Sequence, residues 1–252
     1  MPDSNQSDTV AVLLVGGMGT RLRSVVPDTP KPLAAVGSKS FLELLIRQLH
    51  DQHIRRVVMC TGYRAEQIES HFEDGRRYGV YIHYSRELQP QGTGGAIKLA
   101  EAHLQAMARF IVMNGDSFME MNFANLLKFH EDKKAILSMA VRRVPNAGRY
   151  GTVELDVDQR VIAFREKTGL EMAGIVNAGV YVFNCEVLQM ISHSPCSLEK
   201  DILPKLLDRG VYALEQHGEF IDIGTPEDYA RAQQMHARLY EAASLKATEV
   251  RS

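Results

Sequence analysis

The feature that most constrains the fold is an apolar run of strand length, Val10–Val15, that passes directly into the glycine-rich segment Gly16–Gly19. A continuous apolar run is typical of a strand that is buried on both faces, as in a parallel sheet. Glycines at the end of such a strand allow a turn whose backbone N–H groups face a phosphate. The two segments predict an α/β fold, with either a phosphate loop or a plain tight turn after the first strand.

Strand-like and helix-like segments alternate through the first half of the chain. Strands are predicted at Arg56–Thr61, Val80–Tyr84 and Phe110–Met113. Helices, recognised mainly by apolar residues at helical spacing, are predicted at Phe41–Gln52, Arg64–Phe72, Gly94–Gln105 and Phe123–Glu131. This βαβα order predicts a doubly wound sheet with right-handed crossovers.

The second half is richer in strand-like segments. The predicted elements are strands at Ile136–Arg142, Gly151–Asp156, Val161–Glu166 and Ala178–Phe183, a helix at Leu198–Leu207, and strands at Val211–Glu215 and Glu219–Ile223. Thr225 and Pro226 are typical of a helix N-cap and first position, and they predict a last helix that runs to about Ala243. We interpret residues 10–243 as one α/β domain with a β-rich insertion, between a disordered segment 1–9 and a tail 244–252.

Composition argues against several classes of protein. There are 29 Lys and Arg residues against 31 Asp and Glu, a formal net charge of −2, whereas nucleic-acid-binding domains usually carry a basic excess. No apolar run approaches the roughly 20 residues of a membrane helix, and the N-terminus lacks a signal-peptide pattern. The three cysteines form no CxxC motif. We therefore expect a cytoplasmic protein, monomeric or homodimeric, without a nucleic-acid or membrane partner.

Two basic residues lie near the glycine-rich segment. Arg21 follows it, and Lys31 stands between Pro30 and Pro32, which stiffen the backbone around it. Leu22 occupies the place of the third Rossmann glycine, and the P-loop pattern is also missing. An arginine and a lysine beside a glycine loop suit a triphosphate and its departing pyrophosphate, although a single lysine is more often a solvated surface residue.

Two aspartates follow predicted strands. Asp116 comes soon after Phe110–Met113, and Asp222 lies near the end of the strand predicted at Glu219–Ile223. Because the carboxyl ends of strands line the ligand crevice of an open α/β sheet, both carboxylates could reach one Mg²⁺. The alternative is a pair of loop caps, especially for Asp222, because Thr225 marks a helix start close by.

A series of ordered motifs resembles the sugar-1-phosphate nucleotidylyltransferase family. LLVGGMGTRL is followed by PKPL, and the later matching segments are Gly92–Ala96, Asn114–Asp116, Arg149–Gly151, Glu166–Lys167, Asn177–Tyr181 and Asp222–Pro226. The resemblance extends over about 10–229. It implies the nucleotide-diphospho-sugar transferase fold, a Rossmann-like doubly wound mixed sheet with a β-rich sugar-binding insertion.

The resemblance also implies a role for each matching residue. Residues 10–134 mainly bind nucleotide and residues 135–224 mainly bind sugar phosphate, with 225–243 as a C-terminal helix. The implied catalytic residues are Arg21, Lys31, Asp116 and Asp222, and the two aspartates hold Mg²⁺. The implied nucleotide-binding residues are Leu14, Gly16, Gly17, Gly19, Thr20, Arg21, Gln91, Gly92, Thr93, Asn114 and Asp116. The implied sugar-phosphate-binding residues are Gly151, Glu166, Lys167, Asn177 and Gly179. The glycines of 92–95 would let a flat base approach the main chain, or they form an ordinary first helical turn.

Within the family, the chain resembles most the group that uses GTP and D-glycero-α-D-manno-heptose 1-phosphate. Leu22–Val25 replaces the R-P-L-T that is usual among hexose enzymes. The implied products are pyrophosphate and the NDP-sugar GDP-heptose, for cell-surface polysaccharide synthesis. The alternatives are a hexose 1-phosphate enzyme, either mannose 1-phosphate guanylyltransferase or glucose 1-phosphate thymidylyltransferase, and a non-catalytic regulatory subunit of the same fold. A nicotinamide-binding oxidoreductase is disfavoured by the missing third glycine.

Overall fold

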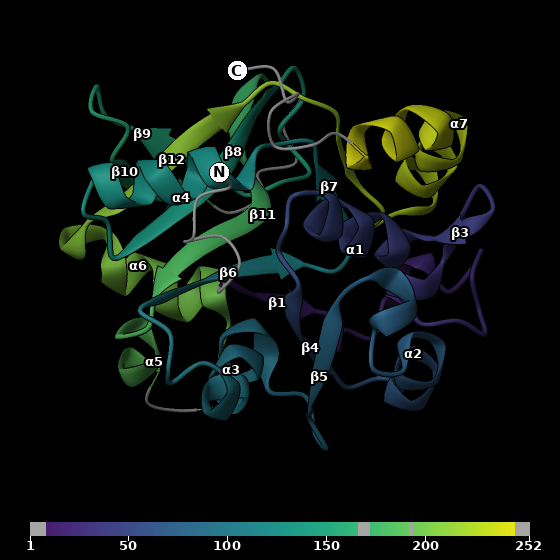
Figure 1. Ribbon diagram of the computed structural model, residues 1–252. Helices are drawn as coiled ribbons and strands as arrows, with labels where there is room; N and C mark the ends of the chain where they lie inside the picture. Colours follow the sequence, from purple (N-terminus) through teal and green to yellow (C-terminus); the bar gives the residue numbers. More distant parts are fainter. Residues whose placement is uncertain (1–8, 166–171, 192–193, 245–252) are drawn as a thin grey trace.

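A nine-stranded mixed sheet forms the centre of the computed structural model, which describes residues 9–165, 172–191 and 194–244. Four parallel strands lie side by side in the order β5 (Tyr81–Arg86), β4 (Arg56–Thr61), β1 (Val10–Leu14) and β6 (Arg109–Asn114) (Figure 1). The alternation seen in the sequence therefore yields the parallel half of the sheet that it predicts.

The remaining strands extend the sheet from β6. Strand β11 (Gly174–Asn184) is antiparallel to β6 and to β8 (Leu137–Val144), and β12 (Val211–Gln216) runs parallel to β8. The two other strands, β9 (Thr152–Leu155) and β10 (Val161–Arg165), form an antiparallel pair that joins β11 through Val176. This part corresponds to the predicted β-rich insertion, and the fold class expected from the sequence is confirmed.

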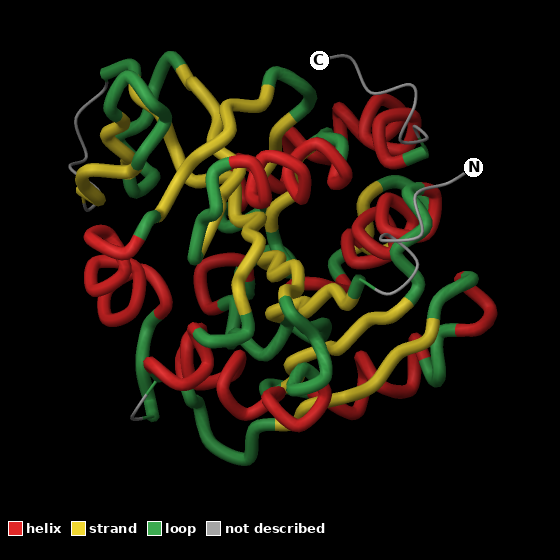
Figure 2. The backbone as a smooth tube through the Cα atoms, turned by 60° about the vertical axis from the view of Figure 1, so that its left-hand side comes forward, coloured by secondary structure: helices red, strands yellow, loops and turns green. Residues whose placement is uncertain are grey.

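The first strand explains why helices are needed on both faces of the sheet. Ala11 and Leu13 point into one core, whereas Val10 and Val12 point into the other, and all four are buried. The first core contains α1 (Phe41–Asp51), α2 (Ala65–Phe72), α4 (Phe123–Asp132) and α7 (Pro226–Ala243). The second contains α3 (Gly92–Leu99), α5 (Val187–Met190) and α6 (Leu203–Leu206). Figure 2 shows the strands running through the middle of the molecule with helices on either side.

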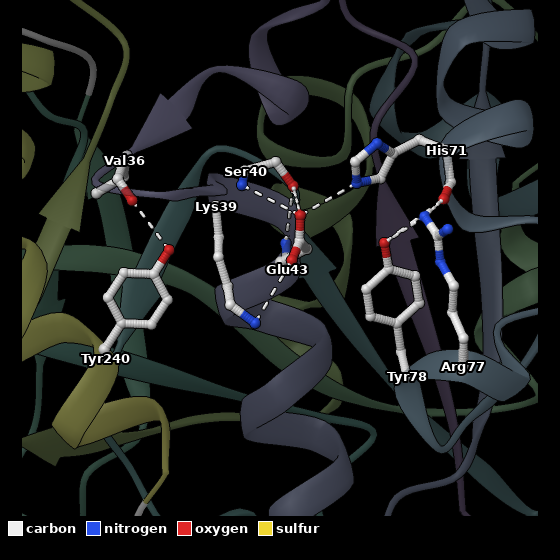
Figure 3. Close-up of polar contacts among 8 residues, drawn as sticks. All are labelled: Val36, Lys39, Ser40, Glu43, His71, Arg77, Tyr78 and Tyr240. Atoms are coloured by element: carbon white, nitrogen blue, oxygen red, sulfur yellow. Dashed lines mark hydrogen bonds and ion pairs between the residues drawn. The ribbon is translucent and has the colours of Figure 1, made fainter.

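Polar contacts fasten the helices of the first core to one another (Figure 3). Ser40 and Glu43 form a capping box at the start of α1, in which each side chain accepts a hydrogen bond from the other's backbone N–H at 3.3 Å. The same Glu43 carboxylate lies 3.1 Å from Nε2 of His71 on α2. Tyr240 on α7 donates to the carbonyl of Val36 at 2.9 Å. Together these contacts hold α1 against α2, and the segment before α1 against α7.

Several boundaries differ from those predicted. The helix predicted at Gly94–Gln105 begins at Gly92, is α-helical only to Leu99, and continues as a 3₁₀ turn, Ala100–His103. The helix predicted at Leu198–Leu207 begins with a π turn, Leu198–Ile202, before the short α6. These segments pack against each other, so tertiary contacts, rather than local preference, set their ends.

Short elements complete the fold. They are β2 (Ala35–Val36), β3 (Lys39–Ser40), β7 (Ser117–Met119), β13 (Phe220–Asp222), and the 3₁₀ turns η1 (Thr20–Leu22), η2 (Lys31–Leu33), η3 (Arg76–Tyr78) and η6 (Leu207–Arg209). Strand β7 is absent from the sequence prediction, because three residues are too few to show a period. Among the described residues, no helix combines the length and the apolar character needed to cross a bilayer.

Candidate nucleotide-binding and catalytic site

A cavity of about 480 Å³ opens at the carboxyl ends of β1, β4 and β6. This is where an open α/β sheet places a ligand. Seven of the residues implied to bind nucleotide line it: Leu14, Gly16, Gly17, Gly92, Thr93, Asn114 and Asp116. The glycine-rich segment after β1 therefore forms part of a pocket wall and is more than a connecting turn.

The glycine-rich segment is shaped to fit Lys31. Gly19 has a φ of +56°, and a Cβ at this position would lie 2.9 Å from the Cβ of Lys31, so a larger residue would be both strained and crowded. From Gly19 the chain turns into η1, which carries Arg21. A Cβ at Gly224 would lie 3.5 Å from Nη2 of Arg21, so this guanidinium reaches the segment that follows Asp222.

Lys31 begins the 3₁₀ turn η2, directly after the extended Pro30. Its ammonium group forms an ion pair with Oδ2 of Asp116. The side chain of Lys31 is only 13% exposed, whereas that of Asp116 is 29% exposed. Lys31 is therefore not the solvated surface lysine of the alternative interpretation, and it lies beside the pocket residue Asp116.

The two aspartates meet through a small antiparallel pair of strands. Strand β13 pairs with β7 so that Asp222 lies opposite Ser117, the residue after Asp116. The Ser117 hydroxyl lies 3.3 Å from Oδ1 of Asp116 and 3.3 Å from Oδ2 of Asp222. The backbone N–H of Gly224 donates to Oδ1 of Asp222 at 2.6 Å. Two carboxylates from distant parts of the chain are thus held around one serine hydroxyl.

The environment of Asp222 penalises its negative charge. Burial, and then the neighbouring charge of Asp116, raise the pKa of Asp222 from 3.8 to about 6, although Lys31 acts in the opposite direction. The alternative role as a helix cap belongs to Thr225, whose hydroxyl accepts from the N–H of Asp228 at 3.2 Å at the start of α7. Asp222 is thus no helix cap, although its Oδ1 accepts from Gly224 in the loop. Two crowded carboxylates fit a divalent cation, which would relieve their repulsion.

The donor set suits a divalent metal ion that takes some of its ligands from substrate. Among the described residues there is no group of three or more histidine, cysteine or acidic side chains that could hold a metal ion. Mg²⁺ is usually bound by one or two carboxylates, while substrate phosphates and water supply its other ligands. Asp116 and Asp222 match that arrangement.

The glycines at the start of α3 are required by close packing against another segment of the chain. Gly92 has a φ of +72°, and a Cβ there would lie 2.3 Å from the carbonyl oxygen of Cys196. Gly94 and Gly95 would likewise meet the segment around Cys196 rather than a ligand. Thr93 accepts from the N–H of Leu198 at 2.7 Å. Close packing of α3 on the 194–198 segment therefore requires these glycines, and they form the first turn of α3, as the alternative interpretation held. The approach of a base to their main chain stays a prediction.

Gln91 is also turned away from the cavity. Its side-chain amide donates to the carbonyl of Gln89 at 2.8 Å, and its Oε1 accepts from the hydroxyl of Ser194. Gln91 is absent from the described lining of the cavity. Its implied contact with nucleotide therefore remains a prediction.

Sequence reasoning missed an acidic residue in the pocket wall. Glu87 follows β5 directly, and its Oε2 accepts from the N–H of Gln91 at 2.9 Å. A Cβ added at Gly62 would lie only 2.5 Å from Oε1 of Glu87, so this carboxylate packs directly against Gly62. Glu87 comes from the carboxyl end of a strand, as Asp116 does, and this signal could have identified it. Burial and then the charge of Glu87 raise the pKa of the nearby Cys60 thiol to about 12, so this pocket residue is no nucleophile near neutral pH.

The predicted sugar-phosphate residues fall into two groups. Asn177 accepts from the N–H of Gly179 at 2.9 Å, and a Cβ at Gly179 would lie 2.8 Å from Nδ2 of Asn114, so this bend adjoins the nucleotide cavity. Gly151 lies before β9, near the backbone of Arg165. None of these three lines the cavity within the described chain. The other two predicted residues, Glu166 and Lys167, lie outside the described residues.

The fold and the crowded acidic site define a phosphoryl-group-transferring α/β protein, and comparison with known proteins specifies which family. The family model described as nucleotidyl transferase matches residues 10–238, and the chain belongs to this family. The resemblance drawn from the motifs is confirmed, and with it the expectation of an enzyme that transfers a nucleotidyl group.

Three similar proteins indicate the part of the family concerned. The chain is 42% identical to a D-glycero-alpha-D-manno-heptose 1-phosphate guanylyltransferase of Aneurinibacillus thermoaerophilus, over 88% of this chain and 96% of that protein. It is 36% identical to a mannose-1-phosphate guanylyltransferase catalytic subunit beta of Drosophila pseudoobscura pseudoobscura, of which it spans only 60%. The crystal structure of HddC from Yersinia pseudotuberculosis complexed with GMP-PN has a TM-score of 0.81 and 33% identity, over 90% of this chain and 99% of that chain.

Proposed function

We propose that this enzyme transfers GMP from GTP to D-glycero-α-D-manno-heptose 1-phosphate, giving GDP-heptose and pyrophosphate. The observation that carries the choice of base is the Glu87 carboxylate in the wall of the nucleotide cavity. An ionised carboxylate only accepts hydrogen bonds. Guanine presents two neighbouring donors, its ring N–H and its exocyclic amino group, along one edge, so it matches a carboxylate better than the other bases do. The heptose and guanylyltransferase names of the similar proteins support the same assignment.

The chemistry requires little beyond positioning and charge compensation. An oxygen of the sugar phosphate attacks the α-phosphorus of GTP, the P–O bond to the β-phosphate breaks, and pyrophosphate leaves in line. The attacking oxygen is already an anion, so no general base is needed, and the reaction proceeds by orientation and electrostatic stabilisation. Lys31 and Arg21 supply positive charge beside the acidic pair, where the triphosphate is expected.

Asp116 and Asp222 would hold the Mg²⁺ that this family of reactions implies. The bound ion supplies positive charge to the α-phosphate and the departing pyrophosphate. Ser117 keeps the two carboxylates on the same side of the site. Lys31, paired with Asp116, balances part of the acidic charge before substrate arrives.

The sugar phosphate would occupy the side of the cavity formed by the β-rich insertion. Gly179, whose N–H donates to Asn177, lies against Asn114, which is itself a cavity residue. We assign Gly151, Glu166 and Lys167 to the same region by family resemblance, with Lys167 binding the sugar phosphate. We further propose that the protein acts in the cytoplasm, as a monomer or homodimer, with GDP-heptose serving cell-surface polysaccharide synthesis.

The test is a pyrophosphate-release assay that crosses GTP, ATP, CTP, UTP and dTTP with heptose 1-phosphate and mannose 1-phosphate. We expect the highest kcat/KM for GTP with the heptose phosphate. Mannose 1-phosphate should be used roughly 10–200-fold less well, because one extra hydroxymethyl group gives limited discrimination. A preference for dTTP or UTP, or for the hexose phosphate, would contradict the proposed substrates and leave nucleotidyl transfer intact.

A further inference from the structure

A second hollow, of about 540 Å³, lies beside the catalytic region, and its lining includes Tyr150, the residue before the predicted sugar-phosphate residue Gly151. It is formed by the end of β8 and the loop after it, the start of β13, and one face of α7. Within the described chain, no residue lines both this hollow and the nucleotide cavity. We call it the arginine hollow, because Arg142, Arg143, Arg149 and Arg231 all line it.

Arg142 differs from the other three lining arginines in its hydrogen-bond partner. It is half-buried, and its Nη1 donates to the backbone carbonyl of Gln216 at 3.0 Å. Among the described residues, no carboxylate forms an ion pair with it. A guanidinium that is partly removed from water and lacks a carboxylate retains donors for an incoming anion.

Two other arginines share a single acid. Arg149 Nη2 lies 2.9 Å from Oδ1 of Asp228, and Arg231 Nη2 lies 3.7 Å from the same oxygen. The side chain of Asp228 is only 7% exposed, whereas those of Arg149 and Arg231 are 49% and 47% exposed. The acid is therefore behind the arginines, and both guanidinium groups remain accessible from the hollow.

The charges around the hollow leave a positive excess. Arg143 is paired with Glu215, with Nε and Oε1 3.2 Å apart. Glu219 is the acidic residue in the described lining, and its carboxylate pairs at 3.4 Å with Arg238, which lies outside that lining. The four lining arginines thus outnumber the carboxylates that pair with them. A planar guanidinium group can donate two parallel hydrogen bonds to the oxygens of one phosphate.

An apolar wall completes the hollow. The rings of Tyr150 and Phe220 lie with centroids 6.0 Å apart, and Met235 of α7 also contributes to the lining. The guanidinium carbon of Arg149 lies over the Tyr150 ring, 5.8 Å from its centroid, so cationic and aromatic groups lie together in the lining and fit a phosphorylated organic molecule. From this arrangement we propose that the arginine hollow binds a diphosphate group, either free or as part of a nucleoside diphosphate.

The hollow is physically linked to the acidic pair. Phe220 lines the hollow and Asp222 belongs to the acidic pair, and both lie on the three-residue strand β13. Asp228, which holds two of the arginines, also accepts from the Thr225 hydroxyl at 2.9 Å, next to the start of α7. An anion that draws Arg149 and Arg231 away from Asp228 alters the support of the segment that carries Asp222.

Calorimetric titration of the whole protein tests the proposal with the catalytic cavity already filled, a step that rests on the proposed use of GTP. The catalytic cavity is first saturated with Mg²⁺ and the non-hydrolysable analogue GMP-PNP, and pyrophosphate or GDP is then titrated. We expect saturable binding that weakens about tenfold or more in Arg142→Gln and in Arg231→Gln, because each loses charge-assisted hydrogen bonds. The matched control is Arg76→Gln, an arginine that is 75% exposed and pairs only with Asp74 among the described residues.

The two probes distinguish the source of the diphosphate. Equal affinities indicate a site for free pyrophosphate, whereas tighter binding of GDP that is lost in Phe220→Ala indicates a nucleoside diphosphate. Arg231 lies on the exposed face of α7, so the Arg231→Gln variant should fold normally. The test therefore remains decisive even if Arg142→Gln is unstable. Absence of saturable binding, or wild-type affinity in both arginine variants, overturns the proposal.

Discussion

Lys31 and Asp116, 85 residues apart in the chain, form an ion pair at the carboxyl end of β6. The contact joins the glycine-rich side of the site to the acidic pair, because Lys31 also packs against Gly19. A cation in this position can both compensate Asp116 in the free enzyme and bind phosphate in the complex. Its removal should therefore affect catalysis more than folding.

We expect Lys31→Ala to lower kcat for nucleotidyl transfer by about 10²–10³-fold, the usual cost of losing one group that stabilises transition-state charge. The KM for sugar 1-phosphate should change little, because Lys31 lies on the nucleotide side. Steady-state kinetics with each substrate varied in turn measures both quantities. Lys205→Ala, at an exposed position, is the control. A change confined to the KM for sugar phosphate would place Lys31 in the other half of the site.

Asp222→Asn should make the metal-free protein more stable while abolishing turnover. The folded pKa of Asp222 is about 6 against an ordinary 3.8, so the charged form costs folding free energy above about pH 6, and the cost disappears as the pH falls towards 4. The cost corresponds to about 2–3 kcal/mol. Urea unfolding at pH 7.5 should show a gain of this order in the variant, and Mg²⁺ should stabilise the wild type only.

The control for this prediction is Asp208→Asn, which removes an exposed acidic side chain elsewhere. It should leave activity, stability and the response to Mg²⁺ unchanged. If Asp222→Asn retained near wild-type activity at limiting Mg²⁺, its carboxylate would be no metal ligand.

Glu87→Gln should weaken the preference for GTP. The amide keeps the size of the side chain but loses the charge and one acceptor, so kcat/KM for GTP should fall by about 10–100-fold, as expected when a charge-assisted hydrogen bond is lost. The kcat/KM for ATP should change much less. Competition assays with both nucleotides measure the ratio, and Glu186→Gln at an exposed position serves as the control. An unchanged GTP-to-ATP ratio would assign base recognition to other residues.

Gly92→Ala should destabilise the protein by at least about 2 kcal/mol, because it combines a left-handed backbone with a severe overlap. The φ is +72°, and the new Cβ would lie 2.3 Å from the carbonyl oxygen of Cys196. Gly17 provides the contrast, since a Cβ there meets nothing within 4 Å. Gly17→Ala should change thermal stability little but raise the KM for GTP, because Gly17 lines the cavity. Equal melting temperatures for the two variants would contradict the packing described for α3.

His130 should contribute to the pH dependence of stability. Its Nε2 lies 3.0 Å from Oδ1 of Asn184 and its Nδ1 lies 3.0 Å from the Ser138 hydroxyl, which matches a neutral ring, and burial lowers its pKa. The stability that the neutral ring contributes to the folded protein is complete above about pH 6.5, the ordinary pKa of histidine, and it decreases as the pH falls. The difference in unfolding free energy between wild type and His130→Gln, measured from pH 7.5 to 5, should therefore shrink. A constant difference would show that His130 does not titrate in this range.

The sequence predicts the parallel half of the sheet well, because its strands are long apolar runs separated by distinct helices. The run at Val10–Val15 requires burial on both faces, and the structure provides two cores. The motif residues Gly16, Asn114 and Asp116 also meet in one cavity, since all three lie at or just after the ends of strands that finish at the same edge.

Other parts of the site depend on contacts that leave no local pattern. Strand β7 exists because Ser117–Met119 pairs with β13, about a hundred residues later, so no periodicity reveals it. Glu87 belongs to no motif recognised from the sequence, and its one sequence signal is its place directly after β5, whose carboxyl end faces the cavity. The glycines of α3 fit a ligand-approach pattern, but their neighbour is the 194–198 segment.

The pairing of β7 with β13 also sets when the enzyme can become active during its synthesis. Ser117 and Asp222 are 105 residues apart, and a ribosome adds roughly 5–20 residues per second. About 5–20 seconds therefore separate the emergence of the two halves of the acidic pair. During that interval the nascent chain already has the glycine-rich segment, Lys31 and Asp116, but it lacks the carboxylate of Asp222. A partly synthesised chain is therefore unable to form the complete site, and catalytic competence arrives only after nearly the whole domain has been made.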